Sequence, residues 1–193
     1  MKLQTKKYEL QNNKGFTLVE MIVAVALFSV VMVVGMGALL NVLNANRQAQ
    51  AIQTAVNNLN LAMEMISREI RTGHNYHCGD SGSYDKPKDC LFGDDFLAFE
   101  PYDGDINDPN DQTVFKLEDG RIKKSEYSGS GFSSLTSEEL VLQFLNFIVV
   151  GSSKVDNIQP KVLVVAKGYV GVKESNRTFF NSQTTVSQRI IDF

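Results

Sequence analysis

The sequence predicts an α+β protein in which a long N-terminal helix packs on a mainly antiparallel β-sheet. An apolar run over residues 16–43 passes, without a proline, into a polar stretch with helical periodicity. Beyond residue 112, short β-branched and apolar runs alternate with turn signals, as expected of strands and hairpins. The predicted parts are a basic leader, a membrane helix, an amphipathic helix and a β-rich head, over residues 1–15, 16–43, 44–72 and 73–193.

The apolar run is long enough to cross a membrane. Residues 16–40 carry Glu20 as their single charge, and a helix of this length spans the ~30 Å hydrocarbon core of a bilayer. The run exceeds the core of a secretory signal peptide, so we expect it to stay with the mature protein. Four lysines and one glutamate give residues 1–15 a charge of +3, against −3 for the whole chain. The positive-inside rule then places the N-terminus in the cytoplasm and the head outside.

The stretch after residue 44 has the pattern of an amphipathic helix. Its apolar residues recur at alternating steps of three and four, and they are Ala49, Ile52, Val56, Leu59, Met63, Ile66 and Ile70. Arg71 and Thr72-Gly73 supply a C-terminal stop. We therefore predict one helix over residues 16–71, roughly 80 Å long. Its apolar stripe is expected to pack on a sheet of the same chain, because the many Asn and Gln residues would weaken an independent coiled coil.

The head is predicted from turn and strand signals. Residues 73–112, rich in Gly, Pro and Asp, are expected to be a loop-rich insert. After it we predict a hairpin, a Gly/Ser loop and three further strands in a sheet of four to six strands, over residues 113–127, 128–134, 140–150, 162–172 and 178–190.

Cys78 and Cys90 are the only cysteines of the chain. An even count in an exported protein favours a disulfide, which would stabilise a loop of this size by ~3 kcal/mol on the chain-entropy model. Free thiols remain an alternative. So does a zinc site that includes His74 and His77, although the spacing matches no standard zinc pattern.

Asp103, Asp105 and Asn107 begin an acidic stretch that continues to Asp111. Oxygen side chains at alternate positions resemble the start of a calcium loop. An EF-hand, however, needs Gly at the sixth position and an acid at the twelfth, where Asp108 and Val114 stand. A solvated acidic turn and a calcium site both remain open, and no other cofactor is expected.

No pattern of a catalytic site is found in the sequence. The chain has no Gly-x-Ser-x-Gly, phosphate-loop or dinucleotide motif, so we expect a protein that is not an enzyme. The acidic exported part also argues against general nucleic-acid binding, which depends on neutralising phosphates.

Lys14-Gly15-Phe16-Thr17-Leu18-Val19-Glu20, in front of the apolar run, resembles the class III signal of type IV prepilins and type II secretion pseudopilins. The resemblance implies that a prepilin peptidase cleaves after Gly15, that the new N-terminal Phe16 is methylated, and that Glu20 guides subunits into a filament. A carboxylate is expensive inside a membrane. Pairing with the N-terminal ammonium of a neighbouring subunit would relieve both charges.

The head adds a second resemblance, to J-type minor pseudopilins and W-type minor pilins. It rests on the size of the head, on Leu135-Thr136-Ser137 before a strand, and on the tail over residues 183–189. It implies a minor subunit that initiates or caps a type II secretion or type IV pilus filament. Its expected partners are prepilin peptidase, other pilin or pseudopilin subunits, the inner-membrane assembly platform and the bilayer. The expected location is the inner membrane, as a single-pass protein, and then the filament tip.

A second function remains open from the sequence. The same anchor would also suit a tip adhesin or a module that binds DNA or another substrate. The insert over residues 73–112 would then be the recognition surface, because loops on a rigid scaffold commonly carry binding.

Overall fold

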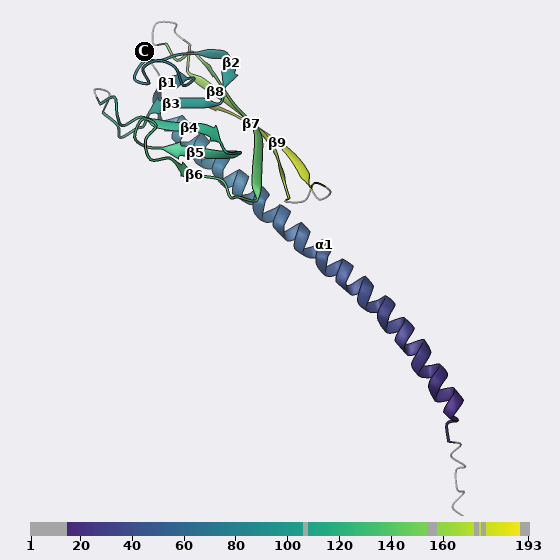
Figure 1. Cartoon of the computed structure of the whole chain (residues 1–193). Coiled ribbons are helices and arrows are strands. Elements are labelled where there is room, and N and C mark those ends of the chain that lie inside the picture. Colours follow the sequence, from purple (N-terminus) through teal and green to yellow (C-terminus); the bar gives the residue numbers. More distant parts are fainter. Residues whose placement is uncertain (1–14, 106–107, 154–157, 172–173, 175–176, 190–193) are drawn as a thin grey trace, which may run out of the picture. The chain divides into compact units, whose positions relative to one another are not determined.

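The structure, a computed structural model, describes residues 15–105, 108–153, 158–171, 174 and 177–189. The chain forms two compact units, Met1–Gln48 and Ala49–Phe193. The leader prediction over residues 1–15 falls, except for Gly15, outside the described residues. The predicted α+β class is confirmed: one long N-terminal helix is followed by antiparallel strands (Figure 1).

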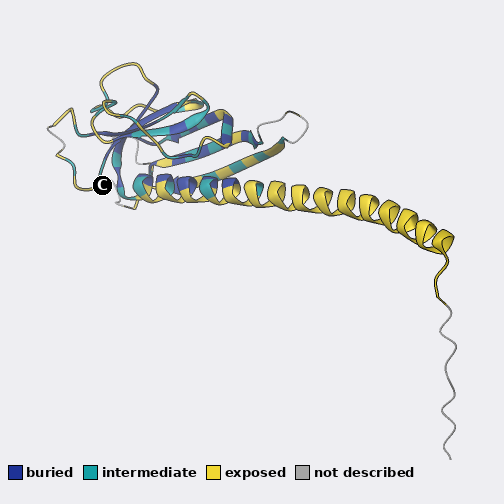
Figure 2. Ribbon diagram, turned by 60° about the horizontal axis from the view of Figure 1, so that its bottom comes forward, coloured by how far each residue is buried: buried dark blue, intermediate teal, exposed yellow. Residues whose placement is uncertain are grey.

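Helix α1 spans Leu18–Thr72, close to the predicted bounds of residues 16 and 71. In the first unit every described residue is exposed, which Figure 2 shows as an unbroken yellow helix. Among the described residues, α1 is the one helix long and apolar enough to cross a membrane. Such a surface is unstable in water, so this part of α1 needs lipid or other helices around it.

In the second unit, α1 buries one face. The buried residues are Ala55, Leu59, Ala62, Met63, Ile66 and Ile70. The predicted stripe is therefore confirmed from Leu59 onward, and Ile52 is partly buried and packs against the same core. The stripe was wrong at Ala49 and Val56, which are exposed. The packed face of a straight helix drifts around the axis, because 3.6 residues per turn do not match a repeat of seven in two turns. Ala55, which the predicted stripe does not include, is therefore buried in place of Val56.

The head contains nine strands within the described residues. They are β1 His74–Cys78, β2 Cys90–Asp94, β3 Phe96–Glu100, β4 Thr113–Glu118, β5 Arg121–Ser125, β6 Ser133–Ser134, β7 Leu140–Val150, β8 Lys161–Val170 and β9 Thr178–Ser187. The predicted hairpin and the three last predicted strands agree with β4, β5, β7, β8 and β9 to within a few residues.

These strands form two sheets instead of the single sheet of the prediction. One has the order β1-β3-β4-β5-β6 and the other the order β2-β7-β8-β9, and all pairings are antiparallel. Residues 73–112 were predicted to be a loop-rich insert, and this prediction was wrong for β1, β2 and β3. Strand β3 is even buried along its whole length. These strands have five residues each, too few to show a period between the surrounding Gly and Pro signals.

The C-terminal end of α1 packs tightly against the first sheet. A Cβ atom at Gly73 would collide with the ring of Phe99 on β3, so glycine permits this close approach. The buried hydroxyl of Tyr76 on β1 donates to the carbonyl oxygen of Ile70 at 2.6 Å and lies 2.8 Å from that of Gly73. Carbonyl groups at a helix end lack partners within the helix, so Tyr76 both fills the core and satisfies them.

Candidate functional site

The N-terminal end of α1 is built around Thr17 and Glu20. The hydroxyl oxygen of Thr17 accepts a hydrogen bond from the backbone N–H of Glu20 at 3.2 Å. The carbonyl oxygen of Thr17 accepts the N–H of Met21, also at 3.2 Å. Thr17 is therefore the N-cap and Glu20 the third helical residue, the Thr-x-x-Glu arrangement of a capping box. A carboxylate in the first turn also suits the positive end of the helix dipole.

The residues in front of this cap are open. Phe16 is 78% exposed, and no side chain or backbone atom would lie within 4 Å of a Cβ at Gly15. The peptide bond between Gly15 and Phe16 therefore belongs to an exposed, non-helical segment just before the helix. An uncovered segment without helical hydrogen bonds is the kind of backbone that a peptidase can bind.

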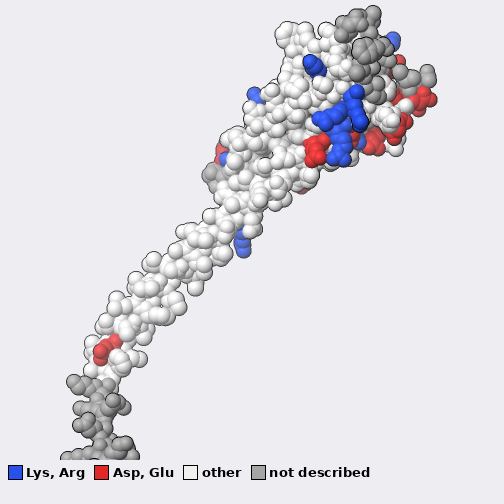
Figure 3. All heavy atoms as spheres, turned by 180° about the vertical axis from the view of Figure 1, so that it is seen from behind, with Lys and Arg blue, Asp and Glu red and all other residues white. Residues whose placement is uncertain are grey.

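Glu20 is the only charged residue between Phe16 and Asn46. In the view of Figure 3, the membrane-length part of α1 carries acidic atoms at one place near its beginning and no basic ones. On the head, by contrast, acidic and basic side chains gather side by side. An isolated carboxylate on an apolar helix either finds a cationic partner in lipid or raises the free energy of the membrane-inserted state.

Comparison with known protein families gives a match over residues 10–36, to the prokaryotic N-terminal methylation motif. The matched segment is thus similar to the N-terminal motif on which the expectation of a type IV pilin-like or pseudopilin-like protein rests. It covers Gly15, Phe16 and Glu20, the residues singled out from the sequence. The motif implies processing by a prepilin peptidase and assembly with other pilins, and proteins of this kind are typically structural subunits. Comparisons with curated proteins and with solved structures give no match.

Cys78 on β1 and Cys90 on β2 are joined by a disulfide, with 5.8 Å between their Cα atoms. Both sulfurs lie close to the carbonyl oxygen of Phe147 on β7. The bond thus connects the first strand of one sheet to the edge strand of the other. Neither sulfur is therefore left to bind a metal. The ring nitrogens of His77 lie within hydrogen-bonding distance of the carbonyl oxygens of Lys86 and Ser81, inside the loop that the disulfide closes.

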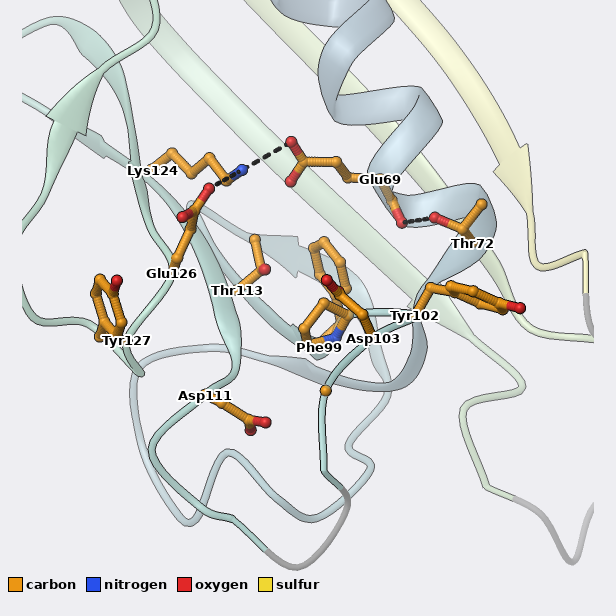
Figure 4. A pocket seen from close by; sticks show the side chains of 12 residues that line it. Glu69, Thr72, Phe99, Tyr102, Asp103, Asp111, Thr113, Lys124, Glu126 and Tyr127 are labelled. Atoms are coloured by element: carbon orange, nitrogen blue, oxygen red, sulfur yellow. Dashed lines mark hydrogen bonds and ion pairs between the residues drawn. The ribbon is translucent and has the colours of Figure 1, made fainter.

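A cavity of about 390 Å³ opens on the head between the end of α1 and the loop that joins β3 to β4. Figure 4 shows its lining, with Lys124 directed toward Glu69 of α1 and toward Glu126. The Lys124 Nζ atom lies 2.8 Å from a carboxylate oxygen of each. Asp103 and Asp111 line the same cavity. Its wall is therefore strongly acidic, and its one lysine among the lining residues is already paired with two carboxylates.

The predicted calcium residues lie in this β3–β4 loop. Asp103 and Asp105 are exposed, and Asn107 lies outside the described residues. Within the part of the chain that the structure describes, no three His, Cys, Asp or Glu side chains are grouped as metal ligands. The calcium site at Asp103, Asp105 and Asn107 thus stays a prediction.

Sequence reasoning missed the most unusual carboxyl group of the head, Glu100. It is the last residue of β3 and only 1% exposed. Burial raises the pKa of Glu100 above its ordinary value, a hydrogen bond from Gln112 works in the opposite direction, and the charge of Asp111 raises the pKa further. A Glu at the end of an apolar strand, followed by Pro, was the available signal, but it did not reveal that the side chain points inward.

Proposed function

We propose that this chain is a minor pilin or pseudopilin subunit that helps to initiate or cap a type II secretion or type IV pilus filament. The observation that carries the proposal is the N-terminal methylation motif, which leads directly into the exposed, membrane-length first part of α1. After cleavage at Gly15, Phe16 would carry the α-ammonium group, and Glu20 would lie one turn into the helix.

Charge pairing gives the assembly step its specificity. In lipid, the ammonium group of one subunit and the Glu20 carboxylate of another are each poorly solvated, and together they neutralise one another. The apolar surface of residues 18–46 supplies contact area but little choice of partner, since lipid tails are equally apolar. The charge pair would therefore select the register between neighbouring helices.

The minor role is supported by the head. More than a hundred residues follow α1 and form two sheets with a disulfide between their edges. This agrees with the resemblance of the tail and head to J-type pseudopilins and W-type minor pilins. A low-copy subunit at the tip of the filament, exported from the inner membrane, accounts for the anchor and for the large head.

The structure suggests a sharp assembly experiment. Glu20→Gln removes the charge but keeps a side chain that can complete the capping box, because Gln serves at this position as Glu does. Glu20→Ala removes both. In the native cells, we expect both variants to be processed normally but to lose co-purification with the other filament subunits and to lower filament number at least tenfold. Glu64→Gln, an exposed glutamate on the same helix, is the matched control.

The two variants separate charge from capping. If Glu20→Gln assembles like the wild type while Glu20→Ala fails, the contribution of Glu20 is to the helix end and the charge-pairing proposal is wrong. If both assemble like the wild type, the subunit does not enter the filament in the proposed way. Normal processing in each case would show that the loss concerns assembly and not cleavage.

A further inference from the structure

Strand β9 is an open edge of its sheet. The order β2-β7-β8-β9 places it at one end, with β8 as its single neighbour among the described strands (Figure 1). Its pairing with β8 continues over ten positions, from Lys161 opposite Ser187 to Val170 opposite Thr178, without a register shift. Every second N–H and C=O group of an edge strand points away from its neighbour. Strand β9 therefore presents a long, regular row of backbone groups with which another strand can pair.

The other sheet edges that the structure describes are protected against such pairing. Strand β6 has only two residues. Strands β1 and β2 have five residues each, and each carries a register shift, between His74 and His77 in β1 and between Cys90 and Asp94 in β2. Short length and bulges are usual ways to prevent edge-to-edge pairing. Strand β9 has neither protection, and it contains no proline and no charged residue.

The exposed face of the sheet beside this edge is basic and aromatic. Strands β7, β8 and β9 carry Lys161 and Lys167 as their only charged residues, although the whole chain has a net charge of −3. Both lysines are exposed. Just before β9, the guanidinium carbon of Arg177 lies 4.3 Å from the ring centre of Tyr169. The ring centres of Tyr169 and Phe179, on β8 and β9, are 6.0 Å apart.

The two lysines can reach a strand that is added to this edge. On β9, Ser187 lies opposite Lys161 and Asn181 lies opposite Lys167, and both are short, exposed side chains. An added strand would lie about 10 Å from β8, twice the spacing of neighbouring strands, and a lysine and a glutamate side chain together bridge this distance. Neither lysine forms an ion pair within the described residues. The charge of both is thus available to a partner.

We propose that β9 binds an extended, acidic strand of another protein by β-strand addition. The backbone groups of β9 supply the affinity, as in other complexes of this kind. Lys161 and Lys167 select acidic side chains at alternate positions of the incoming strand, since alternate residues of a strand share one face. The rings of Tyr169 and Phe179 offer a contact for an apolar or aromatic side chain at one end.

Charge decides between this partner and a second copy of the chain. Strand β9 has no carboxylate, so pairing of β9 with β9 of another copy would leave Lys161 and Lys167 of both copies without a counter-charge. An acidic strand neutralises them. The proposal does not depend on the filament role, since it concerns one edge of the head.

Binding of synthetic peptides to the full-length chain in detergent tests the proposal. The probe is a nine-residue peptide, blocked at both ends, in which glutamate alternates with valine, threonine and tyrosine. In the matched control peptide, lysine replaces each glutamate. By fluorescence anisotropy, we expect the acidic peptide to bind at least tenfold more tightly than the basic one, and its binding to weaken as salt is added. Equal binding of the two peptides, or no binding of the acidic peptide up to about 1 mM, would overturn the proposal.

Charge reversal shows whether the two lysines select the partner. In the double variant Lys161→Glu, Lys167→Glu, the preference should reverse, so that the basic peptide binds at least tenfold more tightly than the acidic one. Lys86→Glu, at an exposed lysine of the disulfide loop, should keep the preference of the wild type. A double variant that still prefers the acidic peptide would contradict the assigned role of the lysines.

Amide hydrogen exchange shows whether the peptide pairs with the edge. Saturating acidic peptide should slow exchange within Thr178–Ser187 at least tenfold, and peptide binding without this protection would place the contact elsewhere and overturn the proposal. Light scattering of the chain without peptide completes the test. A dimer in detergent with β9 already protected would overturn the proposal in favour of pairing between two copies.

Discussion

The Nζ atom of Lys124 on β5 lies 2.8 Å from Oε1 of Glu69 on α1, across 55 residues of sequence. Both side chains are largely buried, with 14% and 29% of their surfaces exposed. This ion pair connects the last turns of the helix to the first sheet at the rim of the acidic cavity. It is stronger than a surface pair because little water screens it.

Replacing Lys124 by methionine should lower the free energy of unfolding by about 1–2 kcal/mol at pH 7, between the values for exposed pairs and for buried charged hydrogen bonds. Burial acts to lower the pKa of Lys124, but its hydrogen bonds to Glu126 and Glu69 outweigh it, and the pKa is raised. The stabilisation is thus full below the unfolded-state pKa of about 10.4 and is lost as the pH rises through the folded value. Denaturant unfolding at neutral and alkaline pH measures both effects.

The control for this variant is Lys161→Met, an exposed lysine on β8. Two results would be incompatible with the ion pair as a stabilising contact. One is an equal loss of unfolding free energy in the two variants at pH 7, and the other is a difference in this free energy between wild type and Lys124→Met that grows at alkaline pH.

Ile66→Ala should lower the free energy of unfolding by about 2–5 kcal/mol, because the side chain is 0% exposed in the core and its removal leaves a cavity. Leu61→Ala, on the same helix but 59% exposed, should change it by about 0.5 kcal/mol or less. Denaturant unfolding of both variants gives the comparison. Similar losses of unfolding free energy in Ile66→Ala and Leu61→Ala would mean that the buried face of α1 has been assigned incorrectly.

Asp89→Asn should lower the free energy of unfolding by about 1–3 kcal/mol. The carboxylate accepts the backbone N–H groups of Gly151 at 3.0 Å and Ser152 at 2.8 Å, where β7 ends. An amide has one oxygen for two donors, so one N–H would face an NH₂ group. Asp80→Asn, at an exposed position of the disulfide loop, is the control, and hydrogen exchange at Gly151 and Ser152 should accelerate only in Asp89→Asn.

Glu118 should contribute to the loss of stability in acid. Hydrogen bonds from Lys116 and then Lys123 lower its pKa from 4.5 to about 2. Its contribution is therefore present above pH 4.5 and is lost as the pH falls toward 2. The difference in Tm between the wild type and Glu118→Gln should shrink over this interval, and a difference that stays constant from pH 6 to pH 2 would argue against the pairing.

The helix was predictable because its signals are local and long. A stripe that recurs from Leu59 to Ile70 and a stop at Gly73 fix both the length and the buried face, and the motif around Glu20 is contiguous in sequence. Strands β7, β8 and β9 were also predictable from the sequence, since each has ten or more residues and includes many apolar or β-branched ones.

The arrangement of the sheets was not predictable in the same way. The edge strand β2 pairs with β7, so that Cys90 lies opposite Val149, and nothing in five residues indicates so distant a partner. The proximity of Glu100 and Asp111 could not be predicted for a similar reason. These two residues are separated by a loop whose closure depends on Gly104 lying against the Glu100 carboxylate, a tertiary contact with no sequence period.

The intact mass and N-terminal sequence of the protein, extracted from its native membrane, test the central claim most directly. The account predicts a chain that begins at Phe16 and carries one additional methyl group, while cells without prepilin peptidase should yield the chain beginning at Met1. A chain that still begins at Met1 in cells with active peptidase would contradict the prepilin interpretation. Residues 16–43 would then be an ordinary membrane anchor for the head.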